Sequence, residues 1–140
     1  MKRISIFAAG LAAVLVVALA LPSLAATSPR IAARPHNTMV NTTINLSGRG
    51  FPAHTTLTIA ECSRTSWVVV QQPCDTDNSI TVHTDRHGRF TSAFTVELCP
   101  RPNAGSGHIT REKCFIGNPQ PQGVDTITLV GAARIIVTYP

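Results

Sequence analysis

SITVHTDRHGRFTSAFTV, residues 79–96, contains two runs of alternating side chains on either side of a four-residue turn. In the second run, Phe90, Ser92, Phe94 and Val96 share one face, and three of these four side chains are apolar, as expected of a strand with one buried side. The turn Asp-Arg-His-Gly has Asp at its first position and Gly at its last, which a type I turn prefers. We therefore predict a β-hairpin whose strands cover residues 79–84 and 89–96.

The same alternation continues on both sides of this hairpin. From Val40 to Leu46 the even positions are apolar or β-branched, whereas the odd positions are Asn or Thr. Turn residues interrupt the pattern about every ten positions, a spacing typical of β-sandwiches. Further strands are predicted at residues 55–62, 66–72, 113–117, 124–130 and 133–139. No helical period appears after residue 25, so the sequence predicts an all-β domain.

The N-terminus has the pattern of a secretory signal peptide. Lys2 and Arg3 precede an apolar run over residues 4–21, and the small residues of Ser23-Leu24-Ala25 form a cleavage site before Ala26. An uncleaved membrane anchor is the alternative, because about 18 apolar residues are close to the length of a membrane-spanning helix. We expect residues 1–25 to be removed, residues 26–37 to form a flexible lead-in, and residues 38–140 to form one secreted, extracellular domain.

Charge gives no sign of a nucleic-acid-binding surface. Without the signal peptide the formal net charge falls from +5 to +3, since Lys2 and Arg3 are lost. The remaining cations, almost all arginine, are scattered along the chain without a basic run. Clustered cations are the usual mark of nucleic-acid binding, so we expect these arginines to form a solvated surface.

Four cysteines in an exported chain normally form two disulfides. Cys62 with Cys74 and Cys99 with Cys114 would each close a short loop, whereas an alternative pairing would join two sheets as in immunoglobulins. The spacing of the cysteines fits neither a zinc site nor a redox C-x-x-C motif, so no metal is expected.

His83, Asp85 and His87 are the strongest candidates for a metal or catalytic cluster, because they recur at every second position. The turn at residues 85–88 is expected to make them diverge. The sequence has no G-x-S-x-G motif and no spaced pair of carboxylates. We therefore predict no catalytic residue and no enzyme activity.

Several motifs together resemble the neocarzinostatin-type apoproteins of actinobacteria, over roughly residues 38–130. These motifs are LSGRGFPAHTTLTIAEC at 46–62, CDTDNSITVHTDRHGRFTSAFTV at 74–96, CFIG at 114–117 and GVDTITL at 123–129. The resemblance implies a seven-stranded, immunoglobulin-like Greek-key sandwich with a small disulfide-stapled ribbon subdomain. It also implies a monomeric carrier, in which a cleft holds a non-covalently bound, apolar enediyne-type chromophore. Members are described as antibacterial, and as associated with DNA only through the released chromophore.

The resemblance also suggests individual site residues. Cys62, Cys74, Cys99 and Cys114 match the two disulfides of the family. The expected ligand contacts are Trp67, Ser79, Phe115 and Gly117, with Gly117 on the floor of the cleft. Ser79 stands where an aromatic residue is usual in the family. An alternative function is a secreted immunoglobulin-like interaction module without a ligand, in which Ile135, Ile136 and Val137 form an edge strand or pair with a partner.

Overall fold

The computed structural model describes residues 27–71, 73–97, 99 and 111–140. These residues form nine strands and no helix, which confirms the predicted all-β fold. The predicted signal peptide and most of the loop between Cys99 and Cys114 lie outside the described residues. No helix among the described residues is long and apolar enough to cross a membrane.

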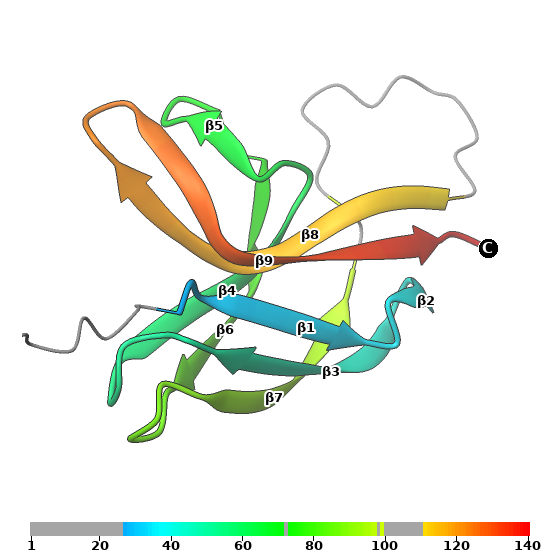
Figure 1. Cartoon of the computed structure of the whole chain (residues 1–140). Coiled ribbons are helices and arrows are strands. Elements are labelled where there is room, and N and C mark those ends of the chain that lie inside the picture. Colours follow the sequence, from blue (N-terminus) through cyan, green and yellow to red (C-terminus); the bar gives the residue numbers. More distant parts are fainter. Residues whose placement is uncertain (1–26, 72, 98, 100–110) are drawn as a thin grey trace, which may run out of the picture.

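The strands form two sheets that pack face to face (Figure 1). Sheet A has the order β1-β3-β7 and contains β1 (Arg30–Arg34), β3 (Thr42–Arg49) and β7 (Phe90–Val96). Sheet B has the order β2-β9-β8-β4-β6, with β5 paired to β9. Its strands are β2 (Asn37–Met39), β4 (Thr56–Cys62), β5 (Ser66–Val68), β6 (Cys74–His83), β8 (Arg111–Gln122) and β9 (Thr126–Thr138). Two of the nine strands, β2 and β5, have three residues each, and the other seven are longer.

The main core lies between the two sheets. Ile44 and Phe94 of sheet A and Ile59 and Ile116 of sheet B are each at most 1% exposed. They occupy alternate positions in their strands, as the period-two pattern of the sequence predicted. Burial of such side chains is the main source of stability in a sandwich of this size.

The predicted hairpin at residues 79–96 is wrong as a pair of neighbouring strands. The turn itself forms, because the Gly88 N–H donates to the Asp85 carbonyl at 3.0 Å. However, β6 pairs with β4 in sheet B, whereas β7 pairs with β3 in sheet A. The apolar sides of β6 and β7 therefore face the shared core from opposite layers. Alternation shows which side of a strand is buried but not which strand is its partner. The pattern is the same whether two strands lie side by side in one sheet or face each other from two sheets.

The structure also corrects the flexible lead-in expected at residues 26–37. Residues 30–34 form β1, which pairs with β3 along its whole length, and residues 37–39 form β2. Ile31 and Ala33 of β1 are buried in the main core. Only two buried side chains mark this strand, so its alternation was too short to distinguish it from a loop.

The two predicted strands at residues 124–130 and 133–139 are one continuous strand, β9. It bends at Gly131, which has a φ of +73°, and the pairing with β8 shifts register beside this residue. β9 lies between β2 and β8 rather than at an edge of sheet B. Ile135 and Val137 are completely buried, so the C-terminal segment belongs to the core, contrary to the edge strand considered for it.

Candidate ligand-binding site

Both local disulfides predicted from the spacing of the cysteines are present. Cys62 and Cys74 face each other as partners in the β4–β6 ladder, and their disulfide staples the segment that contains β5. Cys99 and Cys114 form the second disulfide, and both residues are buried in the main core. The immunoglobulin-like pairing between sheets is therefore excluded.

A second apolar cluster lies on the side of β4 that faces away from sheet A. We call it the Trp67 cluster. It consists of the buried residues Ala60, Cys62, Trp67 and Leu129, with Cys74, Phe115 and Ile127 packed against them and partly buried. Ala60 and Cys62 alternate with Ile59 and Glu61 along β4, so the cluster and the main core lie on opposite faces of sheet B.

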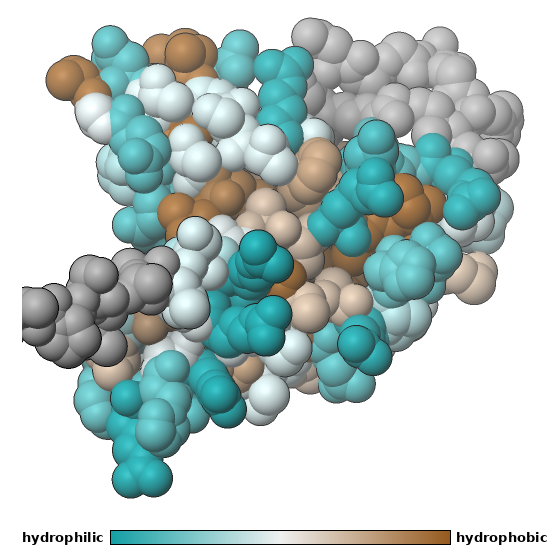
Figure 2. Space-filling model, viewed as in Figure 1, coloured by the Kyte–Doolittle hydropathy of each residue, from teal (hydrophilic) through white to brown (hydrophobic). Residues whose placement is uncertain are grey.

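Trp67 points into this cluster and is 7% exposed. It lies on β5, where its register partner on β9 is Ile127. The valines that follow it, Val68 to Val70, are exposed, so only the tryptophan of this stretch is held inside. Figure 2 shows apolar surface along the middle of the molecule and at the tip of the upper lobe, which Figure 1 identifies as the lobe of β5 and the β8–β9 turn.

Two of the other expected ligand contacts belong to the same region. Phe115 packs against the Trp67 cluster. Gly117 lies directly beneath Leu129, and a Cβ atom at Gly117 would be only 2.5 Å from the Leu129 Cγ. The missing side chain at Gly117 therefore makes room for Leu129, where the resemblance had suggested room for a ligand.

Ser79 lies outside the cluster. Its side chain is exposed, and its hydroxyl donates to the Thr76 carbonyl at 3.0 Å. The next residue, Ile80, packs against the main core, so Ser79 is on the outer face of β6. This is the same face of sheet B that carries the Trp67 cluster.

The packing of the Trp67 cluster limits where a ligand can bind. Trp67 and Leu129 are both under a tenth exposed, so their side chains fill the centre of the cluster. Its edge is more open, because Cys74, Phe115 and Ile127 are only partly buried. A small apolar molecule would therefore lie against this edge, or would displace Leu129 from its place above Gly117.

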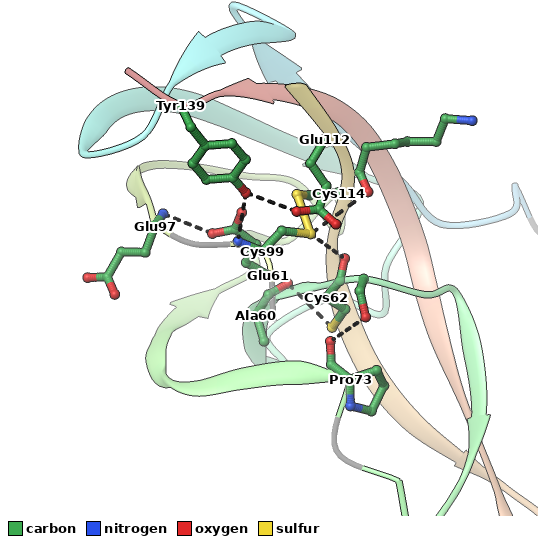
Figure 3. The surroundings of a disulfide bond; sticks show 11 residues. Ala60, Glu61, Cys62, Pro73, Glu97, Cys99, Glu112, Cys114 and Tyr139 are labelled. Carbon is green, nitrogen blue, oxygen red and sulfur yellow. Dashed lines mark hydrogen bonds between the residues drawn. A yellow bond between two sulfur atoms is a disulfide. The ribbon is translucent and has the colours of Figure 1, made fainter. Parts of the chain in front are cut away.

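Glu61 is an ionisable group that the site prediction missed. Its side chain is completely buried beside the disulfide of Cys99 and Cys114 (Figure 3). One carboxylate oxygen, Oε2, accepts the Glu97 N–H at 3.0 Å, whereas Oε1 has no hydrogen-bond partner among the described residues. Glu61 follows Leu57 and Ile59 at alternate positions, so the pattern of β4 already placed it on the inner face.

Burial has a clear electrostatic effect on Glu61. Loss of hydration raises the pKa of its carboxyl from an ordinary value of 4.5 to about 7, against the lowering effect of the Glu97 N–H. The charges of Asp75, Glu97 and Glu112 raise the pKa further. One carboxylate oxygen of Glu61 and the two sulfur atoms of this disulfide lie within 4.8 Å of one another. Because these sulfur atoms are bonded to each other, they are not thiolate ligands for a metal.

The histidine and aspartate cluster considered at the 85–88 turn separates as expected. The His83 Nδ1 is 3.0 Å from the Thr56 hydroxyl. The Asp85 carboxylate accepts the N–H groups of His87 and Arg89, so it closes the turn. The three side chains thus have different local partners.

Comparisons with known proteins give a distant likeness among solved structures. No family model matches the chain, and no curated protein matches it. Among solved structures, macromomycin is similar over 81% of this chain and 100% of its own length, with 18% sequence identity and a TM-score of 0.48.

Proposed function

We propose that this chain is a secreted, monomeric carrier that holds a small apolar ligand of the enediyne type against the edge of the Trp67 cluster. The observation that carries this proposal is a second apolar cluster outside the main core, stapled by the disulfide of Cys62 and Cys74. A dry, apolar surface with few polar groups is what shields a reactive, poorly soluble molecule from water. The sequence motifs that resemble neocarzinostatin-type apoproteins support the same function.

In this proposal the protein has no catalytic step. Antibacterial activity and damage to DNA belong to the released ligand, and the protein meets DNA only through it. Phe115 supplies an aromatic side chain at the partly buried edge, where it packs against the cluster that contains Trp67. Gly117 contributes by leaving room for Leu129, and Ser79 is exposed outside the Trp67 cluster.

Fluorescence gives a direct test, because Trp67 is the only tryptophan of the chain. Titration of the secreted protein with an aromatic enediyne-core analogue should quench or shift the Trp67 emission in a saturable way. Phe115→Ala should weaken binding by about tenfold or more, because one buried aromatic contact with the ligand is lost. Val124→Ala is the matched control, since Val124 is 92% exposed at the β8–β9 turn and lies outside the cluster.

Two results would count against the carrier. One is an emission that does not change at high micromolar analogue. The other is an equal loss of affinity in Phe115→Ala and Val124→Ala, which would mean that the analogue adheres to apolar surface in general.

The second candidate function is an interaction module, and one observation favours it. Val68, Val69, Val70 and Val124 are all exposed, and the Val69 N–H donates to the Asp125 carbonyl at 2.9 Å. The apolar tip is thus formed by the loop after β5 and the β8–β9 turn together. Replacement of Val70 and Val124 by Ser should abolish any binding to a protein partner through this tip, and should leave binding of the enediyne-core analogue unchanged.

A further inference from the structure

A polar hollow of about 550 Å³ lies at one end of sheet A, away from the Trp67 cluster. It is formed where β1 begins, β3 ends and the turn before β7 returns to the sheet. Its lining contains three arginines, a histidine and two hydroxyl side chains: Thr27, Ser28, Arg30, Arg49, Gly50, His87 and Arg89. No acidic residue is among these lining residues.

The three arginines stand in a row across the sheet, and we call them the arginine row. Arg30 and Arg49 are direct register partners in the β1–β3 ladder. The β3–β7 ladder ends with Gly48 opposite Phe90, so Arg89 is the next residue beside Arg49. All three arginines are exposed, because their neighbours in the strands face the main core. Like charges in direct opposition across a sheet are unfavourable unless something neutralises them.

The protein supplies little negative charge at this place. β1, β3 and β7 contain no Asp or Glu. The adjoining turn provides one carboxylate, that of Asp85, whose Oδ1 accepts the N–H groups of His87 at 2.7 Å and Arg89 at 2.9 Å. The charges of His87 and Arg89 help to lower the pKa of Asp85, after the larger effect of these hydrogen bonds. The single negative charge of Asp85 therefore cannot neutralise the three positive charges of the arginine row.

One side of the hollow is formed where the backbone of residues 27 and 28 packs against Gly50. Gly50 has a φ of +77°, and a Cβ atom there would lie 2.9 Å from the Thr27 carbonyl and 3.0 Å from the Ser28 carbonyl. Residues 27 and 28 therefore pack closely against the end of β3, which only glycine permits. This contact brings two hydroxyl side chains to the arginine row.

We propose that the arginine row is a binding site for a tetrahedral oxyanion, the phosphate or sulfate group of a small molecule. Guanidinium groups bind such oxyanions through paired N–H donors, and hydroxyl groups of Ser and Thr are additional donors. A doubly charged oxyanion would also neutralise the arginines that oppose each other across β1 and β3. The site is independent of the proposed carrier function, since it shares no residue with the Trp67 cluster.

Calorimetric titration at low ionic strength tests this site. Inorganic phosphate, sulfate and glycerol phosphate are the probes, so that a free ion and an esterified group are distinguished. We expect saturable binding of at least one probe. Arg49→Gln should weaken it by about tenfold or more, the usual effect of losing a hydrogen bond to a charged group.

Arg111→Gln is the matched control. Arg111 is exposed at the start of β8 in sheet B, and its replacement changes the net charge by the same amount. It should leave the affinity for the probe unchanged. Arg30→Gln provides a second variant of the row if Arg49→Gln fails to fold, and should weaken binding to a similar extent.

Three results would overturn the site. They are the absence of saturable binding of every probe, an equal weakening by Arg49→Gln and Arg111→Gln, and full affinity in both Arg49→Gln and Arg30→Gln. The second result would show that the net charge of the protein, rather than the arginine row, attracts the anion.

Discussion

The two sheets are similar on their inner faces, but their outer faces differ in polarity and exposure. Inside, Phe94 of sheet A and Ile116 of sheet B are both at most 1% exposed. Outside, sheet A carries the arginine row and is open to solvent, whereas the outer side of β4 and β8 in sheet B is covered by the Trp67 cluster. Alternation thus provides each sheet with one buried face. The outer face is apolar where other side chains cover it, as in sheet B, and polar where it is open to solvent, as in sheet A.

Removal of the tryptophan should have the largest effect on the covered face. Trp67→Ala should lower the free energy of unfolding by about 3–5 kcal/mol, because it leaves a cavity in a cluster that has few other large side chains. Urea denaturation followed by circular dichroism measures this loss. Val70→Ala is the control: its side chain is 90% exposed, and we expect a change within about 0.5 kcal/mol. A loss below about 1 kcal/mol in Trp67→Ala would mean that the cluster does not stabilise the fold.

Removal of the disulfide between Cys62 and Cys74, beside the Trp67 cluster, should have the next largest effect on stability. Replacement of both Cys62 and Cys74 by Ala should cost about 3 kcal/mol, since their disulfide closes a loop with a sequence separation of 12. The pair Cys99 and Cys114, with a separation of 15, should cost a similar amount when replaced. The denaturant midpoints of the two double variants show whether the disulfide beside the Trp67 cluster and the one in the main core contribute equally to stability.

Glu61 makes the inner face of sheet B sensitive to pH. Its pKa is raised to about 7 in the folded protein, so between pH 4.5 and 7 the folded state holds a proton that the unfolded state has released. The free energy of unfolding should therefore fall as the pH rises through this interval, by up to about 3 kcal/mol. Urea denaturation between pH 5 and pH 8 measures the slope.

Glu61→Gln is the matched variant for this dependence. The amide cannot ionise but still offers an oxygen to the Glu97 N–H. We expect it to flatten the pH dependence and to be more stable than the original protein at pH 8. An unchanged slope in Glu61→Gln would assign the titration to another group.

The smallest effect is expected on the open face of sheet A. In the absence of phosphate and sulfate, Arg49→Gln should raise the free energy of unfolding by about 0.2–1 kcal/mol, because it removes one of two directly opposed charges. The gain should shrink as salt is added, since exposed charges are screened. A destabilised Arg49→Gln at low salt would show that the arginine row is already neutralised within the protein.

Much of this architecture was predictable from local pattern. The buried positions of β3 and β7 follow from alternation, and the turn at Asp85 follows from its residue types. The separation of β6 and β7 into different sheets was not predictable, because strands joined by a short turn have the same pattern whether they share a sheet or face each other across the core. Likewise Trp67 was suggested by the family resemblance, but Leu129, which covers Gly117, lies too far along the chain for any local signal.

The sequence by itself determined the all-β class and the inner face of most strands, and it favoured the two local disulfides, because each of these depends on residues that are close together in the chain. The tertiary structure alone decided where the arginines gather. Arg30, Arg49 and Arg89 are far apart in the sequence, where they form no basic run, and strand register brings them into one row. Register depends on contacts between distant segments, so a charge pattern across strands cannot be read along any one of them.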